Sequence, residues 1–323
     1  MEQKKKIIAI VGPTASGKTA LSIALSRAFG GEVVSCDSMQ VYRDMDIGTA
    51  KPTLEEREGI LHHLLDVALP TAPFSCADYV TLATEAVEDI LSRGQLPVLC
   101  GGTGLYLDRF LQGGVMEETG SDPAVRQRLT EEAARLGNHA LHCRLAQVDP
   151  ESAAAIHENN VKRVIRALEI YETTGITKTE SDRRTQMFSS PYDALVIGLR
   201  YTDRDLLYRR IGQRVDMMLS QGLLDETRRL MEQGVFEVNS TAAQAIGYKE
   251  MLAYLRGEES LESAVERLKT ATRRYAKRQM TWFCAKDYVH WLDADRNGEL
   301  LPRQELISSA HELINRFLQA ESN

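Results

Sequence analysis

The sequence predicts an α/β fold in which a parallel sheet core carries an inserted helical domain. Over the first hundred residues, short apolar runs alternate with helical patterns, as they do in βαβ units. A glycine-rich phosphate-binding motif follows the first of these runs. A long helical stretch then interrupts the strands, and the chain of 323 residues is long enough for one core domain with such an insertion.

Each predicted element rests on local signals. Short apolar, β-rich runs predict strands at 7–11, 32–36, 97–100, 194–199 and 288–292. A helix is expected from Lys18 to Phe29, because the glycine pair that follows is a stop signal. A second helix is expected over 77–93, and further helices between the fourth strand and about residue 285. The polar tail after Asp293 should end in a helix, to which no function is given.

The inserted domain is predicted at 117–191, which leaves a core of 1–116 and 192–323. The insertion is rich in Ala, Leu, Arg and Glu and contains no convincing strand. Proline after aspartate, at Asp122 and at Asp149, is typical of a helix start.

Composition excludes several classes of protein. A net charge of −7 excludes a uniformly basic nucleic-acid coat, although a local basic patch can still bind phosphates. The five scattered cysteines contain no C-x-x-C pair, which argues against a zinc site and for a reducing compartment. The N-terminal apolar run is too short for a signal peptide or a membrane span. We therefore expect a cytoplasmic protein without a membrane partner.

The strongest motif is a complete G-x-x-x-x-G-K-[ST] sequence between a predicted strand and a predicted helix. Its residues are Gly12, Pro13, Thr14, Ala15, Ser16, Gly17, Lys18 and Thr19. Backbone N–H groups and the helix N-terminus should surround a phosphate, while Lys18 reaches its oxygens and the Thr19 hydroxyl ligates Mg²⁺. The motif does not reveal which phosphate compound binds.

Polar residues follow the next two strands. Asp37 comes after the second strand, and Thr103 stands among glycines after the third. Ligands of open parallel sheets bind beyond the carboxyl ends of the strands, so both residues should face the phosphate motif. Asp37 could accept a proton or hold magnesium, and Thr103 could approach a phosphate or a reacting group. A helix cap and a plain turn explain the same residues equally well.

Basic residues cluster twice. Arg273, Arg274, Lys277 and Arg278 should lie opposite an inward stripe of Val265, Leu268, Thr272 and Tyr275 on a helix near 261–284. Lys162, Arg163 and Arg166 share about one helical turn in the insertion. Such clusters are commonly solvated faces, but two of them in an acidic protein favour a polyanionic partner.

Two adjacent histidines complete the candidates. His62 and His63 would point to opposite faces of a strand, so they should not share a metal. One of them is expected to be buried and the other solvated.

Several segments together resemble the bacterial tRNA dimethylallyltransferases, also called tRNA isopentenyltransferases. The resemblance covers roughly residues 6 to 292, and the DSMQVYR block is its most specific part. The matching segments are 12–19, 37–53, 62–66, 101–113, 162–175, 245–250 and 273–283. The C-terminal zinc finger of the eukaryotic relatives has no counterpart in this chain.

The resemblance implies a P-loop NTPase-type, kinase-like core and a specific reaction. The dimethylallyl group of dimethylallyl diphosphate passes to N6 of adenine 37 of a tRNA (a nucleotide number), and diphosphate leaves. Asp37 would be the general base, and Lys18, Thr19, Thr103 and Mg²⁺ would complete the catalytic site. The tRNA base would enter through a channel opposite the diphosphate, and the enzyme would be a monomer.

The resemblance also implies tRNA contacts on both parts of the chain. Near the anticodon they would come from Asp37, Ser38, Met39, Gln40 and Thr103. In the insertion they would come from Arg126, Lys162, Arg163, Val164, Ile165 and Arg166. In the core they would come from Gln244, Gly247, Tyr248, Lys249, Lys277, Arg278 and Gln279.

Two other classes of protein share the phosphate motif. A small-molecule or nucleotide kinase would bind ATP and move a phosphoryl group, and without the resemblance it would be the first choice. A GTPase-type switch would carry an N-K-x-D motif, which the sequence lacks.

Overall fold

The computed structural model describes residues 4–113, 122–186 and 190–320. It divides into two compact units, a core of Met1–Leu111 with Pro191–Asn323 and a helical unit of Gln112–Ser190. The predicted domain boundary between 116 and 117 lies outside the described residues. No described helix combines the length and apolar character that crossing a membrane requires.

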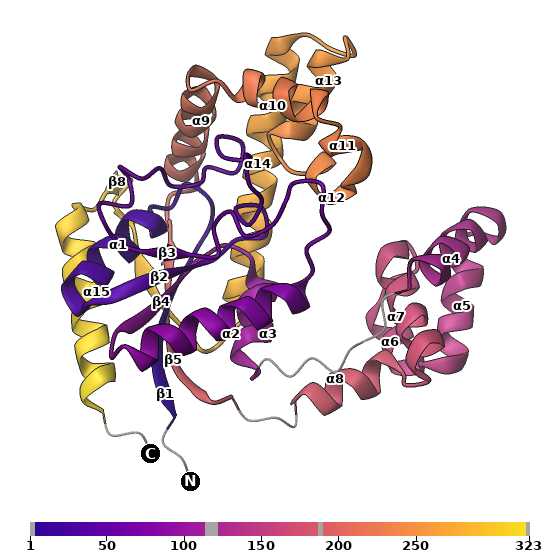
Figure 1. Ribbon diagram of the computed structural model, residues 1–323, viewed down its shortest axis with the longest axis horizontal. Coiled ribbons are helices and arrows are strands. Elements are labelled where there is room, and N and C mark those ends of the chain that lie inside the picture. The colour runs from indigo at the N-terminus through magenta and orange to yellow at the C-terminus, as the bar shows by residue number, and fades with distance from the viewer. Residues whose placement is uncertain (1–3, 114–121, 187–189, 321–323) are drawn as a thin grey trace. The chain divides into compact units, whose positions relative to one another are not determined.

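The core is built on a six-stranded parallel sheet, which confirms the predicted fold class (Figure 1). The strand order is β3-β2-β4-β1-β5-β6. The strands are β1 (Lys5–Val11), β2 (Gly31–Cys36), β3 (His62–His63), β4 (Leu96–Gly101), β5 (Tyr192–Arg200) and β6 (Val289–Asp293). A separate hairpin follows, β7 (Asp295–Arg296) with β8 (Glu299–Leu300).

Helices cover both faces of this sheet. The first are α1 (Lys18–Phe29), α2 (Cys76–Ser92) and α3 (Gly104–Leu111). After β5 come α9 (Arg204–Ser220), α10 (Leu223–Glu232), α11 (Val235–Val238), α12 (Ser240–Ala243), α13 (Tyr248–Leu255), α14 (Leu261–Cys284) and α15 (Arg303–Gln319). One face packs on α2 and α3 through residues such as Val87 and Phe110. The other packs on α1 and α15 through residues such as Leu25 and Ile314, so the tail helix is part of the core.

The helical unit has a hydrophobic core of its own, formed by residues such as Leu129, Leu145 and Leu168. Its helices are α4 (Pro123–Leu136), α5 (Asn138–Val148), α6 (Pro150–Ala155), α7 (Val161–Thr174) and α8 (Lys178–Gln186). The predicted starts at Asp122 and Asp149 are confirmed, because each carboxylate accepts a hydrogen bond from a backbone N–H of the first turn that follows.

The expectation for the two histidines was wrong, because His62 and His63 are both half-buried. They form β3, a two-residue strand at the edge of the sheet. His62 Nδ1 lies 2.9 Å from the Ile60 carbonyl oxygen, and His63 Nε2 lies 2.6 Å from Glu32 Oε2.

Glu32 joins this edge of the sheet to the end of α2. Its carboxylate is buried and also accepts a hydrogen bond from Arg93 Nη2 at 2.9 Å. Hydrogen bonds from Arg93 and from His63 outweigh the effect of burial and lower the pKa of Glu32 from 4.5 to about 2. A carboxyl group whose pKa is lower in the folded than in the unfolded protein stabilises the fold at pH values above its unfolded pKa. This contribution is lost as the pH falls through the folded pKa.

The variant Glu32→Gln should therefore be less stable than the wild type at pH 7, and this difference should shrink by pH 3. Urea unfolding at both pH values measures it. Glu85→Gln, which alters an exposed carboxylate of α2, is the matched control and should show no such convergence. A stability difference that is the same at both pH values would contradict the role of Glu32.

Candidate active site

Three loops meet at one edge of the sheet. They follow β1, β2 and β4, and the ends of these strands are paired, Val11 with Gly101 and Cys36 with Gly101. The phosphate motif, the segment that begins at Asp37 and the turn at Gly102–Thr103 therefore leave neighbouring strands. A Cβ at Gly101 would lie 1.9 Å from the Cys36 carbonyl oxygen, so only glycine allows this close approach.

The phosphate motif forms a strained loop at the start of α1. Ala15 adopts a left-handed backbone conformation with φ of 63°, which is unusual for a residue other than glycine. Neighbouring side chains hold this loop, since Arg210 Nε donates to the Ala15 carbonyl at 2.9 Å and the Tyr201 hydroxyl to the Ser16 carbonyl at 3.3 Å. The buried Ser16 Oγ has no hydrogen-bond partner among the described residues. A buried hydroxyl in this state fits a loop that is shaped for a ligand.

Lys18 lies beside Asp37 and Arg214 in this site. Its Nζ donates to the Pro13 carbonyl at 3.3 Å. Burial lowers the pKa of Lys18, the positive charge of Arg214 lowers it further, and Asp37 acts in the opposite direction. The carboxylate and the two cations therefore share one electrostatic environment.

Arg210 and Arg214 are site residues that the sequence interpretation missed. They lie four residues apart on α9, which places them on one face of the helix. Arg214 is half-buried, and burial lowers its pKa, while the carboxylates of Glu56 and Asp37 act in the opposite direction without forming an ion pair with it among the described residues. Its Nη2 donates a hydrogen bond to the Ala50 carbonyl, at 3.4 Å. The signal was present in the i, i+4 arginines after the returning strand.

A half-buried cation that forms no ion pair is stabilised when an anion binds to it. With Lys18 and the loop amides, Arg214 therefore makes this edge of the sheet a site for a strongly negative group.

The two carboxylate oxygens of Asp37 differ in their hydrogen bonds. Oδ1 accepts from the backbone N–H of Met39 at 2.9 Å and of Gln40 at 3.4 Å, so Asp37 caps a turn; the helix cap considered above is not formed, because a turn and no helix follows Asp37. Oδ2 makes no hydrogen bond to a described residue. Thr103 Oγ1 accepts from the Ser38 N–H at 3.1 Å, which ties the third loop to the second.

Glu226 of α10 anchors the segment that follows Asp37. Its carboxylate accepts hydrogen bonds from the N–H groups of Asp46, Ile47 and Gly48, at 2.9 to 3.1 Å. The Tyr248 hydroxyl donates to the same carboxylate at 2.7 Å. Tyr248 is fully buried, so its side chain supports this loop from inside the protein.

The inward stripe predicted for α14 was wrong in part. The buried residues are Ala264, Leu268, Ala276, Gln279 and Phe283, whereas Val265, Thr272 and Tyr275 are half-buried. The buried face shifts because the helix crosses three separate hydrophobic clusters along its length. Arg273 is half-buried and lies 5.8 Å from the Tyr208 ring, while Arg274, Lys277 and Arg278 are exposed.

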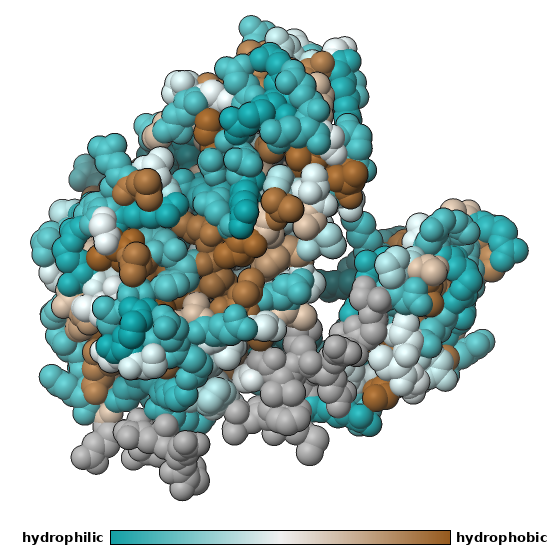
Figure 2. Space-filling view, viewed as in Figure 1, coloured by the Kyte–Doolittle hydropathy of each residue, from teal (hydrophilic) through white to brown (hydrophobic). Residues whose placement is uncertain are grey.

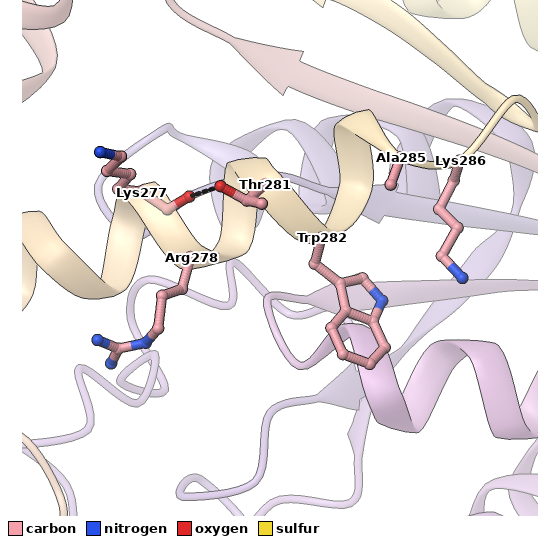
Figure 3. A pocket seen from close by; sticks show the side chains of 6 residues that line it. All are labelled: Lys277, Arg278, Thr281, Trp282, Ala285 and Lys286. Carbon is pink, nitrogen blue, oxygen red and sulfur yellow. Dashed lines mark hydrogen bonds between the residues drawn. The ribbon is translucent and has the colours of Figure 1, made fainter. Parts of the chain in front are cut away.

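A pocket of about 530 Å³ lies along the last turns of α14 (Figure 3). Its described lining residues are Lys277, Arg278, Thr281, Trp282, Ala285 and Lys286. The Trp282 ring lies against Gly104, where a Cβ would come within 2.2 Å of it. Lys286 Nζ lies 5.6 Å from the same ring and forms an ion pair with Asp108 at 2.7 Å. An aromatic floor with cations around it suits a nucleobase and its phosphates.

Part of the surface of the core unit is apolar. Figure 2 shows hydrophobic residues gathered in the middle of the visible face of the core unit, with hydrophilic residues around them. Gathered apolar surface of this kind commonly marks a binding region.

The basic residues of the helical unit differ in their surroundings. Lys162 and Arg163 are exposed at the start of α7. Arg126 and Arg166 both bind the fully buried Glu169, at 3.0 and 2.8 Å. Val164 and Ile165 are buried in the core of the unit, with exposed fractions of 1% and 6%. Their side chains therefore shape the helix and leave its exposed face to the basic residues.

The fold and the site define a P-loop-type α/β enzyme. Its anion-binding site is lined by cationic side chains and lies beside a carboxylate. The IPP transferase family model matches residues 40–286. The tRNA dimethylallyltransferase of Halalkalibacterium halodurans is 50% identical over 290 residues, which cover 90% of this chain and 91% of that protein. The tRNA dimethylallyltransferase of Bacillus subtilis is 49% identical with the same coverage. The chain therefore belongs to the IPP transferase family, and it is an enzyme of the prenyltransferase class.

Solved structures agree with this assignment. The full-length tRNA isopentenylpyrophosphate transferase of Bacillus halodurans matches with a TM-score of 0.73 at 45% identity, covering 99% of this chain and 98% of that one. A eukaryotic dimethylallyltransferase acting on tRNA matches with a TM-score of 0.80 at 32% identity, covering 98% of this chain and 82% of that one.

The anchor at Glu226 yields a prediction about stability. Glu226→Ala would leave three backbone N–H groups and the Tyr248 hydroxyl without their acceptor, so we expect a loss of at least about 3 kcal/mol of unfolding free energy. Glu232→Ala, at an exposed position of the same helix, should stay within about 0.5 kcal/mol of the wild type. Urea unfolding of both variants measures this, and a loss below about 1 kcal/mol for Glu226→Ala would contradict the anchor.

Proposed function

We propose that the chain transfers the dimethylallyl group of dimethylallyl diphosphate to N6 of adenine 37 in tRNAs and releases diphosphate. The observation that carries the proposal is the pairing of a cationic phosphate site with a carboxylate. Lys18 and the half-buried Arg214 lie beside Asp37, at the edge of the sheet where three loops meet. The names of the relatives support the same reaction.

In the donor half of the site, the allylic C–O bond breaks and its electron pair leaves with diphosphate. The negative charge that develops there requires fixed positive charge. The N–H groups of the phosphate motif, Lys18 and Arg214 supply it, and Arg210 holds the loop in shape. Because these groups are held in place by the fold, little reorganisation is needed as the bond breaks.

Magnesium fits the donor half as a partner of the diphosphate. Among the described residues no cluster of three His, Cys, Asp or Glu side chains could hold a metal ion. Mg²⁺ commonly takes few protein ligands and completes its shell with phosphate oxygens and water. The hydroxyl of Thr19, on the first turn of α1, would hold the ion, which would supply additional positive charge to the leaving group.

In the acceptor half, the C–N bond forms at the exocyclic nitrogen of adenine. This nitrogen is a weak nucleophile, so a base that accepts its proton during attack accelerates the reaction. Asp37 Oδ2 is available for this proton, while Oδ1 keeps the carboxylate oriented through the turn that it caps. The segment Ser38–Gln40 and Thr103 lie around this carboxylate and would contact the extruded base, whose extrusion costs a few kcal/mol.

We propose that the enzyme acts as a monomer and grips the anticodon stem-loop through exposed basic side chains. In the helical unit these are Lys162 and Arg163, with Arg126 and Arg166 beside them. In the core unit the exposed residues are Gln244, Lys249, Lys277 and Arg278. The buried Val164, Ile165 and Tyr248 support these surfaces from within, and Gly247 precedes α13. Contacts to phosphates and to loop bases are the usual basis of RNA recognition.

The test is a transfer assay with labelled dimethylallyl diphosphate, magnesium and unmodified tRNA, in parallel with ATP and tRNA. The proposal predicts label on the adenine next to the anticodon on its 3′ side. Consumption of ATP without transfer of label would replace the proposal with the kinase alternative.

Asp37→Asn should lower kcat by roughly 100- to 10,000-fold, because the amide cannot accept the proton of N6. The affinity for tRNA should stay near the wild-type value, since Asn retains the oxygen that caps the turn. Single-turnover kinetics and tRNA binding measure the two effects. Asp44→Asn, at an exposed position of the same segment, is the matched control. A wild-type kcat in Asp37→Asn would eliminate Asp37 as the base.

Arg163→Ala should weaken tRNA binding and reduce the slope of log affinity against log salt by about 1, as expected for the loss of one phosphate contact. Its kcat at saturating tRNA should be retained. Arg135→Ala removes another exposed arginine of the same unit and should leave the slope unchanged. Equal slopes in both variants and the wild type would show that Arg163 lies on a solvated surface and makes no phosphate contact with the tRNA.

A further inference from the structure

Gln279 links two of the three loops of the site. It lies on α14, and its side chain is buried with an exposed fraction of 5%. Its Oε1 accepts a hydrogen bond from the Thr14 N–H at 2.8 Å, within the phosphate motif. Its Nε2 donates to the Gly102 carbonyl at 3.1 Å. One planar amide thus fixes the separation between the loop after β1 and the loop after β4.

The chemistry of this link is specific to an amide. A primary amide offers an acceptor oxygen and a donor nitrogen on one rigid group, so it can satisfy an N–H on one side and a carbonyl on the other. The strand ladder between β1 and β4 ends at Val11 and Gly101, before either of the linked residues. Beyond that pair, Gln279 provides the hydrogen bonds that connect these two loops.

The link extends to the acceptor half of the site. Thr103 follows Gly102, and its N–H donates to the Cys36 carbonyl at 3.2 Å. Its side-chain oxygen accepts from the Ser38 N–H, next to Asp37. Gln279 therefore stands between the loop proposed to hold the diphosphate and the loops proposed to hold the adenine and its base.

A tRNA contact does not explain these bonds. The neighbours Lys277 and Arg278 are exposed, whereas both polar atoms of Gln279 are used inside the protein. The glycine at position 102 is consistent with an internal role for Gln279, because a Cβ there would lie 1.9 Å from Gln279 Nε2 and would displace the amide.

We infer that Gln279 is a positioning residue that sets the reacting carbon of the diphosphate substrate in register with the nucleophilic nitrogen of the adenine. The inference rests on the proposed function. Each half-site keeps its own binding groups without Gln279, so each substrate still binds, but the two reacting atoms lose their alignment. A misplacement of about 1 Å costs on the order of 100-fold in rate.

The primary variant is Gln279→Glu, which has the same shape and accepts from Thr14 but cannot donate to Gly102. Its kcat should fall on the order of 10- to 100-fold. The Kd values for pyrophosphate and for an anticodon stem-loop RNA should each stay within about threefold of the wild type, as positioning without contact requires. Lys277→Ala, at a proposed RNA contact, should instead raise the RNA Kd. Gln304→Glu, at an exposed position of α15, controls for the added charge.

A double-mutant cycle tests the link from its other side. Gly102→Ala should lower kcat through its clash with the amide, and it should add no further loss, within about twofold, in a Gln279→Ala background. These two variants also carry the test if Gln279→Glu does not fold.

Transfer by the wild type is measured first, so that failure of the proposed function is recognised separately. With an active wild type, three results would each overturn the inference. The first is a wild-type kcat in Gln279→Glu, and the second is a raised RNA Kd in this variant at unchanged kcat. The third is a double mutant in which the kcat losses of Gly102→Ala and Gln279→Ala multiply.

Discussion

The parallel pairing of β1, β4 and β2 is the constraint on which the rest of the structure depends. Parallel strands place their carboxyl ends at one edge, and here Val11, Gly101 and Cys36 end in register. The phosphate motif, Asp37 and Thr103 are brought together for this reason, although the motif residue Thr19 and Thr103 are 84 positions apart in the sequence. Covering both faces of the sheet with helices leaves this edge as the place where a ligand can bind.

Loops that leave a sheet edge carry backbone groups that the strand ladder no longer satisfies. Buried side chains from later parts of the chain supply the missing partners. Glu226 accepts hydrogen bonds from three backbone N–H groups of the segment after Asp37, and Gln279 bridges the phosphate motif to Gly102. Lys51 is buried as well and forms ion pairs with Asp46 and Asp66. The geometry of the site thus depends on polar contacts that touch neither substrate.

The sequence predicted those features that rest on local patterns. The phosphate motif, five of the six strands and the caps at Asp122 and Asp149 are each encoded within a few residues. The sixth strand, His62–His63, was missed as a strand because two histidines carry no alternating apolar pattern. The inward stripe of α14 failed because the helix crosses several clusters, which a single periodicity does not describe.

The contacts that hold the site were beyond sequence reasoning for a physical reason. Glu226 meets Asp46 from 180 positions away, and Gln279 meets Thr14 from 265 positions away. Such pairs are selected by the packing of α10 and α14 on the core, and no local propensity reports them. Tyr248 and Gln279 therefore looked like surface residues of a basic, RNA-facing segment, although the fold buries both.

In the proposed mechanism, one edge of the sheet holds the diphosphate and the acceptor base on opposite sides of the Asp37 carboxylate. A crystal structure of the protein with pyrophosphate, magnesium and an anticodon stem-loop RNA tests it most directly. We expect pyrophosphate in the loop 12–19 with Lys18 and Arg214 on its oxygens. We also expect an extruded adenine whose N6 lies within hydrogen-bond distance of Asp37, about 3 Å. An adenine bound elsewhere, or pyrophosphate outside that loop, would contradict this arrangement.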